Sequence, residues 1–318
     1  MPSLHYLHLD VFTDRLFGGN QLAVYLDPPG DLPAETMQAI AREMAFSETT
    51  FVFPPGAAHG AAEPLDFHVR IFTPASELPM AGHPTIGTAF ALADAGRIRP
   101  GATRTVFLEG IGPVPLDLEW EEERLSFAWM TQPRPRFGPA VDAVEKFAEA
   151  TSLRPEDLCP QGWPIEQVSC GVPFVIVPVT SRAALDRARS DAGAHTRAFS
   201  AAGLPEGPVY LFTLEPGPDG ADVYTRMFAP EIGIAEDAAT GSAAGPLGAY
   251  LVQHGLADPS RTIRNLQGVK MGRPSWLSIQ PVLQGPDAAP RSVPREISAM
   301  RVGGQAVLAG EGTLVLPE

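Results

Sequence analysis

The sequence has few of the features that mark secreted, membrane-spanning or zinc-binding proteins. It contains only two cysteines, Cys159 and Cys170, which are too far apart for a C-x-x-C motif and lack the further cysteines of a zinc site. The N-terminus has neither the basic start nor the continuous apolar core of a signal peptide. No apolar run approaches the ~20 residues that a membrane helix needs. We therefore expect a cytoplasmic protein in which both cysteines are small buried side chains rather than a disulfide.

Basic residues are also scarce. The chain has 23 Lys and Arg residues against 37 Asp and Glu residues, and its formal net charge is -14. Such a protein repels nucleic-acid backbones and anionic membranes, so we expect neither as a partner. A small anion is still compatible, because a helix start or a single cation can hold a carboxylate. The sequence lacks a P-loop, a G-x-G-x-x-G motif and a metal-ligand cluster, so no nucleotide, flavin or metal cofactor is expected.

The most distinctive stretch of the chain is residues 226–255. A strand-like segment ending at Phe228 leads to two adjacent carboxylates, Glu236 and Asp237, and then to a run of small residues that opens a helix. The first N–H groups of a helix have no intrahelical acceptor, and the helix dipole favours an anion there. Small side chains let a ligand reach these donors, so the pattern predicts a carboxylate or phosphate site at Gly241, Ser242 and Ala243. The alternative is that the small residues serve only close packing.

A similar pattern occurs earlier, in residues 70–96. The residues that match in the two copies are Arg70 with Arg226, Phe72 with Phe228, and Gly87 with Gly241. In this register His83 lies opposite Asp237. The match continues upstream, where GNQLAVY resembles GVPFVIV. We interpret the chain as an internal duplication of two related halves.

The length and composition agree with two domains. A chain of 318 residues with 44% hydrophobic residues can build two ordinary cores. We place one domain in residues 1–130 and the other in 131–299, with 300–318 as a candidate addition to the first. Residues 131–136 carry two prolines and two arginines and are interpreted as the linker. Further helices are expected over residues 33–44, 141–150 and 183–202.

Glu48 is a candidate general base. It stands at a predicted helix-to-strand junction beside Phe46 and near Phe51, where loss of water would raise the pKa of its carboxyl group toward the working range. The alternative is an exposed loop acid. Glu206 precedes the later strand as Glu48 precedes its own, so the repeat alone does not single out Glu48. Glu206 lies between proline and glycine, which favours an exposed turn.

Two further side chains are candidate ligand-binding groups. His83 precedes Pro84, which disfavours the helical backbone, so we expect His83 just before the helix with its ring pointing beyond the helix end. Arg273 lies in a segment rich in glycine and proline and could meet a carboxylate. Alternatively it only joins two loops.

Five segments together resemble the phenazine-biosynthesis PhzF-like family, whose fold is that of diaminopimelate epimerase. They are FGGNQLAV, FSETTFV, RIFTPASELPMAGHPTIG, RMFAPEIGIAEDAATGSAAGPLGAYL and QGVKMGRPS, and they span nearly the whole chain in the family's order. The resemblance implies an α+β fold of two pseudo-symmetric domains. Each domain would be a curved sheet or barrel around a central helix, with these helices beginning near Thr85 and Gly241. It also implies an active site in the cleft between the domains, and a homodimer.

The resemblance assigns roles to individual residues. It implies that Glu48 is the general acid/base, that His83 and Asp237 are the other catalytic residues, and that Gly82, Gly241 and Ser242 bind substrate. The two helix starts, with Thr85 and Ala243, would hold negative charge, and Arg273 is the candidate cation. Diaminopimelate epimerase exchanges protons with two cysteines. Ala81 and Thr240 stand at the corresponding positions, which excludes a two-thiol racemase.

The function that the resemblance implies is a cofactor-independent isomerisation of a small unsaturated or cyclic carboxylic acid. Glu48 would move a proton on the substrate skeleton. Two other functions compete with this isomerisation. A hydrolase using Ser242 is disfavoured because the surrounding residues do not form G-x-S-x-G. A non-catalytic member of the same fold that binds a small anion remains an alternative.

Overall fold

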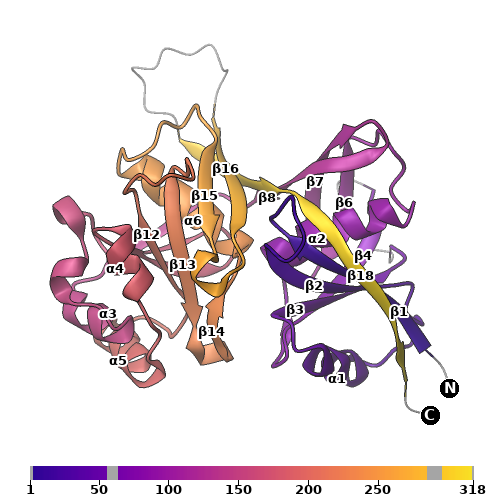
Figure 1. Ribbon diagram of the computed structural model, residues 1–318, viewed down its shortest axis with the longest axis horizontal. Coiled ribbons are helices and arrows are strands. Elements are labelled where there is room, and N and C mark those ends of the chain that lie inside the picture. Colours follow the sequence, from indigo (N-terminus) through magenta and orange to yellow (C-terminus); the bar gives the residue numbers. More distant parts are fainter. Residues whose placement is uncertain (1–2, 56–63, 285–295, 317–318) are drawn as a thin grey trace. The chain divides into compact units, whose positions relative to one another are not determined.

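The computed structural model describes residues 3–55, 64–284 and 296–316 (Figure 1). The chain divides into two compact units. Unit 1 comprises Met1–Thr131 and Gly303–Glu318, and unit 2 comprises Gln132–Val302.

Unit 1 contains a sheet in which sequence-distant strands are neighbours. Hydrogen bonding joins the strands in the order β18, β1, β2, β3, β4, β6, β7 and β8, with β2–β3 and β4–β6 parallel and the other pairs antiparallel. Figure 1 shows β18, in yellow, running beside β1. The strands are β1 (Ser3–Val11), β2 (Asn20–Leu26), β3 (Glu48–Phe53), β4 (Phe67–Phe72), β5 (Glu77–Leu78, beside β4), β6 (Arg104–Glu109), β7 (Gly112–Glu121), β8 (Arg124–Gln132) and β18 (Ala306–Val315).

The central element of unit 1 is α2 (Gly82–Asp94), which contacts β1, β2, β3 and β18. Every residue of α2 from Gly82 to Leu92 is buried, as expected for a helix that is apolar on all sides. Small residues let the strands approach closely. A Cβ atom at Gly87 would lie 2.6 Å from side-chain atoms of both Leu22 and Val11. The helix is therefore fixed by packing along its whole length.

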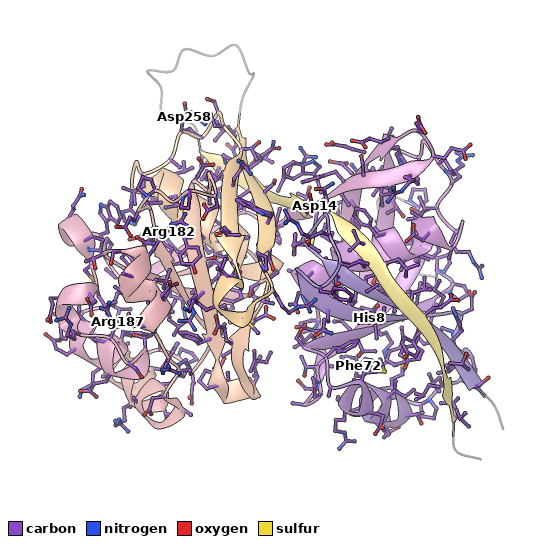
Figure 2. The ribbon with its side chains drawn as sticks, in the orientation of Figure 1. His8, Asp14, Phe72, Arg182, Arg187 and Asp258 are labelled. Carbon is purple, nitrogen blue, oxygen red and sulfur yellow. The ribbon has the colours of Figure 1, made fainter. Side chains whose placement is uncertain are left out.

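The helix α1 (Ala34–Met44) belongs to a second core of unit 1. Its apolar face carries Met37, Ile40 and Ala41, which pack with the aromatic side chains of Tyr25, Phe51 and Phe72. Figure 2 labels Phe72 in this cluster. This core holds the end of α1 close to the start of β3, where Glu48 lies.

Unit 2 repeats the arrangement. Its strands are joined in the order β9, β10, β11, β12, β13, β15 and β16, with β14 beside β13, and with β11–β12 and β13–β15 parallel. The Ser298 hydroxyl on β17 donates to Val282 O on β16. The strands are β9 (Arg136–Ala140), β10 (Glu166–Ser169), β11 (Pro173–Pro178), β12 (Val209–Thr213), β13 (Val223–Ala229), β14 (Ile234–Asp237), β15 (Ile263–Gln267), β16 (Ser275–Leu283) and β17 (Ile297–Gly304).

The central helix of unit 2 is α6 (Gly241–Gln253), which contacts β10, β11 and β16. A Cβ atom at Gly245 would collide with the Gln132 side chain, and one at Gly248 would collide with Ile279. For these two glycines, close packing is therefore the correct interpretation of the small-residue run.

The outer helices α3 (Val144–Ala150), α4 (Arg182–Arg187) and α5 (Ala192–Ala202) supply residues of a separate core, and Figure 2 labels Arg182 and Arg187 on α4. Single 3₁₀ turns lie at Pro155–Asp157, Pro160–Gly162, Pro230–Ile232 and Val269–Met271.

The duplication extends to an ion pair in each unit. Arg70 on β4 makes a two-point contact with Glu77, at 2.7 Å for both N–O distances, and Arg226 on β13 makes the same contact with Glu236, at 2.8 and 2.6 Å. The central helix follows this glutamate at the same separation in both units. Gly82 therefore corresponds to Gly241.

This correspondence corrects the register expected from the sequence. The sequence match placed Gly87 opposite Gly241 and His83 opposite Asp237. The helices begin at Gly82 and Gly241, so His83 is the counterpart of Ser242. The shorter β4-to-helix connection in unit 1 made the sequence match slip by about one helical turn. The helix expected near Thr85 likewise begins earlier, at Gly82.

Other sequence expectations also need correction. The linker expected over residues 131–136 is shorter than predicted, because β8 continues to Gln132 and β9 begins at Arg136, which leaves residues 133–135 between the two strands. The helix expected over 183–202 is divided into α4 and α5, since Asp191 caps the start of α5 by accepting from Ala194 N at 2.8 Å. The helix expected from residue 141 begins at Val144. Across the residues that the structure describes, no helix is long and apolar enough to cross a membrane.

Candidate active site

Glu48 is the first residue of β3 and is buried. It pairs with Leu22 in the parallel strand β2, which fixes its backbone. Its Oε2 atom lies 3.4 Å from Nε2 of His83, and both side chains belong to unit 1. The structure thus brings together two of the predicted catalytic residues.

His83 lies in the first turn of α2, and not before the helix as the sequence suggested. A residue before a proline usually avoids the helical backbone, but His83 is helical here. Pro84 lies in the first turn, where its missing N–H removes no intrahelical hydrogen bond. The ring is almost completely buried. Burial lowers the pKa of His83 from 6.5 to about 3, and a hydrogen bond with the Gln21 backbone opposes this only in part. His83 is therefore a neutral imidazole at neutral pH.

The Nδ1 atom of His83 has a partner in either tautomer. Asn20 Nδ2 lies 3.2 Å from Nδ1, and the Ser47 hydroxyl donates to Asn20 Oδ1 at 3.0 Å, which orients the amide with its NH₂ group toward the ring. If Nδ1 accepts from Asn20, the proton of His83 is on Nε2 and faces Glu48. If Nδ1 instead donates to the Gln21 backbone, Nε2 is an acceptor toward Glu48. Nε2 of His83 can therefore present either a proton or a lone pair toward Glu48, depending on the tautomer.

Glu206 does not share the environment of Glu48. It is exposed, and its Oε1 atom accepts from the Thr196 hydroxyl at 2.8 Å. The strand registers also separate the two acids. Thr49 pairs with Phe72 as Val209 pairs with Phe228, so the counterpart of Glu48 is Pro208. The duplication therefore offers no second acid at the position of Glu48.

Asp237 ends β14 in unit 2 and is buried. Its Oδ2 atom accepts from the Thr240 hydroxyl at 2.6 Å. Gln267 holds the same turn, since its Nε2 donates to Asp237 O and to the Thr240 hydroxyl, at 2.9 Å each, and its Oε1 accepts from Thr240 N at 3.1 Å. The carboxylate of Asp237 and the start of α6 are thus held by one hydrogen-bond network.

A second layer supports Gln267. Tyr210 donates from its hydroxyl to Gln267 Oε1 at 2.9 Å and accepts from Asn265 Nδ2 at 2.8 Å. Burial raises the pKa of Tyr210, so the phenol keeps its proton and remains a donor. Gln267, Tyr210 and Asn265, like Asn20 in unit 1, were not singled out from the sequence. Polar residues inside otherwise apolar strands were the available signal.

The two helix starts offer backbone donors, with one correction. The N–H groups of Gly82, His83, Gly241 and Ser242 are too early in their helices for an intrahelical acceptor. Ala243 was also expected to bind an anion. Its N–H donates to Thr240 O at 3.1 Å instead, because the first turn of α6 is closed tightly.

Thr85 was expected to bind substrate, but its side chain faces the protein interior. The hydroxyl donates to Ala81 O at 2.7 Å and lies 2.6 Å from Oε1 of Glu109 at the end of β6. Thr85 is fully buried. It is therefore placed to support the start of α2. Glu109 was missed by the sequence analysis, although an acid ending an apolar strand could have drawn attention to it.

Arg273 follows the turn Val269–Met271 and its cap residue Gly272, and its N–H donates to Gly268 O at 3.1 Å. The turn approaches the Asp237 loop closely. A Cβ atom at Gly268 would collide with Arg273 O and with Ala238 O. The Arg273 backbone is therefore fixed close to the segment that carries Asp237 and Thr240.

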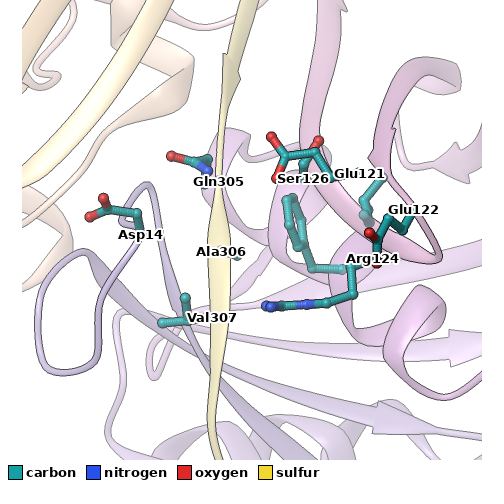
Figure 3. A pocket seen from close by; sticks show the side chains of 10 residues that line it. Asp14, Glu121, Glu122, Arg124, Ser126, Gln305, Ala306 and Val307 are labelled. Atoms are coloured by element: carbon teal, nitrogen blue, oxygen red, sulfur yellow. The ribbon is translucent and has the colours of Figure 1, made fainter.

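A separate cavity of 390 Å³ lies in unit 1, between the β7–β8 turn and the start of β18 (Figure 3). Acidic and polar side chains dominate its wall, including Asp14, Glu121, Glu122 and Gln305, with Arg124 as a cation. None of the predicted site residues lines it. The cavity is therefore distinct from the Glu48–His83 pair.

Two related units, each with strands packed around one buried helix, define an epimerase-like fold. A hydroxyproline epimerase from Agrobacterium vitis, solved with bound trans-4-hydroxy-L-proline, matches 99% of this chain and 93% of its own with a TM-score of 0.63. The identity is 13%, so this likeness concerns the fold alone. The α+β, diaminopimelate epimerase-like architecture expected from the sequence is confirmed.

Closer relatives identify the family. The family model described as phenazine biosynthesis-like protein matches residues 9–312. A trans-2,3-dihydro-3-hydroxyanthranilate isomerase from Pseudomonas chlororaphis is 36% identical over 98% of this chain and 99% of its own. A phenazine biosynthesis protein of the PhzF family from Bacillus anthracis aligns over 99% of this chain and 100% of its own, with a TM-score of 0.83 and 25% identity. The chain belongs to the PhzF-like phenazine biosynthesis family and is an isomerase.

Proposed function

We propose that this isomerase moves a proton on a small unsaturated or cyclic carboxylic acid without a cofactor, with Glu48 as general acid and base. One observation carries the proposal: a buried carboxylate faces a neutral buried imidazole at the start of a helix. Burial removes water that would otherwise compete for the proton, so the pair suits proton transfer near neutral pH.

In the proposed reaction Glu48 takes a proton from a carbon atom next to a double bond and returns it to another carbon of the same skeleton. The proton count is unchanged, as an isomerisation requires. His83 would exchange protons with Glu48 or with a heteroatom of the substrate, using its two tautomers. The N–H groups of Gly82 and His83 would stabilise negative charge that develops on the substrate, by an amount on the order of a few kcal/mol.

Unit 2 would supply the groups that bind the acid itself. The N–H groups of Gly241 and Ser242 are donors suited to a carboxylate, and Arg273 is the candidate cation. Asp237, held by Thr240 and Gln267, would accept a hydrogen bond from a hydroxyl or amino substituent. These assignments predict that Glu48 and Asp237 act on one substrate. A double-mutant cycle of Glu48→Gln and Asp237→Asn tests this, because residues acting on one substrate give strongly non-additive losses.

The first substrate to test is trans-2,3-dihydro-3-hydroxyanthranilate, the compound in the name of the Pseudomonas chlororaphis relative. We expect the purified chain to isomerise it in D₂O and to introduce deuterium at the carbon that receives the proton, as followed by NMR. The non-catalytic alternative predicts binding without deuterium uptake, and binding that survives Glu48→Gln. A homodimer and a cytoplasmic location remain predictions, of which the first is tested by light scattering of the purified protein.

A further inference from the structure

Glu109 is a buried acid in unit 1 that the proposed reaction does not use. It ends β6, is 3% exposed, and touches the first turn of α2 through Thr85. Its Oε1 lies 2.6 Å from the Thr85 hydroxyl, and within the described residues its Oε2 has no hydrogen-bond partner. An ionised carboxylate here would have one donor at most for two charged oxygens, which is a costly arrangement in the protein interior.

The Thr85 hydroxyl lies within hydrogen-bond distance of two oxygen atoms but has one proton to donate. The Thr85 hydroxyl lies 2.7 Å from Ala81 O and 2.6 Å from the carboxyl oxygen of Glu109. A hydroxyl has one proton and cannot donate it fully to both oxygens, so when Thr85 donates to Ala81 O the contact with Glu109 needs a proton on the carboxyl group. The short contact to Glu109 is then satisfied when Glu109 is protonated and donates to Thr85. Burial raises the pKa of Glu109 from 4.5 to about 8, and the Thr85 hydroxyl opposes this rise only in part.

The duplication provides an independent observation. The parallel registers pair Phe67 with Phe107 in unit 1 and Val223 with Asn265 in unit 2, so Glu109 and Gln267 occupy the same position in the two copies. Both side chains reach the start of the central helix. In unit 2 the residue is a neutral amide. In unit 1 it is an acid that matches the amide in shape and charge only while it is protonated.

Charged and titratable groups lie on the elements around Glu109, namely α2, β4, β5 and β7, and on β6 itself. His83 on α2 and His68 on β4 both have pKa values lowered by burial, so both rings are already neutral. Arg70 on β4 and Glu77 on β5 form a two-point ion pair. On β7 the residue opposite Glu109 is Gly112, and the acids of that strand lie further along it, as Asp117, Glu119 and Glu121. On the other end of β6, Arg104 pairs with Asp117. Asp94 lies at the far end of α2.

We propose that Glu109 is a positioning residue whose bound proton keeps the start of α2 free of negative charge, and that its ionisation at alkaline pH weakens the binding of anionic ligands there. A carboxylate beneath the first turn would occupy the favourable field of the helix dipole that an anionic substrate would otherwise use. It would also remove the donor on which the Glu109–Thr85–Ala81 chain of hydrogen bonds depends. The effect on ligands rests on the proposed function, while the effect on the helix start does not.

The first test needs no substrate. In protein labelled with ¹³C at glutamate side chains, one carboxyl signal should titrate with a midpoint near pH 8 and disappear in Glu109→Gln. The amide signals of Gly82 and His83 should shift with the same midpoint in the wild type and stay unchanged in the variant. Glu123→Gln, which changes an exposed acid, should retain both titrations. A Glu109 signal that titrates near its ordinary pKa, or helix-start amides that do not follow it, would overturn the proposal.

The second test measures binding without turnover, with anthranilate as a stable aromatic carboxylate. Its dissociation constant in the wild type should rise by up to about fivefold between pH 8 and pH 9, and should stay nearly constant in Glu109→Gln. The same rise in both proteins would overturn the proposal for ligand binding. Should no variant isomerise any candidate acid, the proposed reaction fails, but the titrations of Glu109 and of the helix-start amides still decide this inference.

Discussion

The side chains of Glu48 and His83 are brought within 3.4 Å of each other by a single strand, β2. Leu22 on β2 pairs with the backbone of Glu48, and Asn20 at the start of β2 contacts the ring of His83. The acid and the imidazole therefore share one rigid support. Their distance depends on strand pairing and helix packing, which hold it more precisely than a loop would.

Replacing Glu48 by Gln should lower kcat by about 10²- to 10⁴-fold, because the amide cannot carry the proton. The Michaelis constant should change little, since the amide keeps the size of the side chain. The measurement is the rate of isomerisation followed by NMR. Glu206→Gln is the matched control and should keep wild-type activity, because Glu206 is exposed and bonded to Thr196. An equal loss of kcat in Glu48→Gln and Glu206→Gln would show that Glu48 is not the general acid and base.

His83 should make unit 1 less stable in acid. Its pKa is lowered from 6.5 to about 3 in the folded protein, so the unfolded chain binds one more proton between these values. The free energy of unfolding should therefore fall as the pH drops below 6.5, by up to about 1.4 kcal/mol per pH unit from this group. Urea unfolding at several pH values would show this, and His83→Gln should have a smaller dependence. Identical pH dependence in both proteins would contradict the burial of a neutral ring.

Glu109 should have the opposite effect on stability. Its pKa is raised from 4.5 to about 8, so the folded protein holds one more proton between these values. The free energy of unfolding should fall as the pH rises from 4.5 to 8, by an amount on the order of a few kcal/mol, and should then level off. In Glu109→Gln this contribution should be missing, so the variant gains stability relative to the wild type as the pH rises. A stability difference that does not vary with pH would show that Glu109 is ionised at neutral pH.

Gly268→Ala should disturb the loop that carries Arg273. The glycine has a φ of 75°, and an added Cβ would collide with Arg273 O and Ala238 O. Gly272→Ala is a matched control, because Gly272 has a φ of 72° and open space around the Cβ position. Both variants should lose about 1–2 kcal/mol from backbone strain. Gly268→Ala should lose about 1–3 kcal/mol more and bind anthranilate more weakly.

Equal effects of the two glycine substitutions on urea unfolding and on anthranilate binding would mean that the contact between the two loops is unimportant. The comparison is informative because the conformational cost is shared. Only the contact with Ala238 and Arg273 differs.

Much of the fold was predictable because hydrophobic period and small-residue runs are local signals. The strand of Glu48, the amphipathic helix α1 and both central helices were predicted close to their observed positions. The return of the final strand to the first unit is confirmed by its pairing with β1. The repeat register was less accurate, since glycine matches can slip. The Arg70–Glu77 and Arg226–Glu236 ion pairs and the strand pairings, which form in three dimensions, fix it.

The candidate site was predictable where a residue type is unusual in its setting, as for Glu48 and His83. The supporting residues were not, because their importance comes from partners distant in the sequence. Glu109 meets Thr85, and Gln267 meets Thr240, only after β6 and β15 have packed beside the central helices. The N–H of Ala243 is used by Thr240 O because the first turn of α6 is tightly closed. Composition does not specify how tightly a first turn closes.

The pairing of β1 with β18 has a consequence for biosynthesis. Residues 3–11 emerge from the ribosome early, but their antiparallel neighbours are residues 306–315, which are made only after all of unit 2. During translation one edge of β1 therefore stays without its partner strand until β18 is made. An unpaired strand edge can pair with other chains and lead to aggregation. Unit 2 is encoded without interruption, so all of its segments are available for folding before β18 is made and unit 1 can be completed.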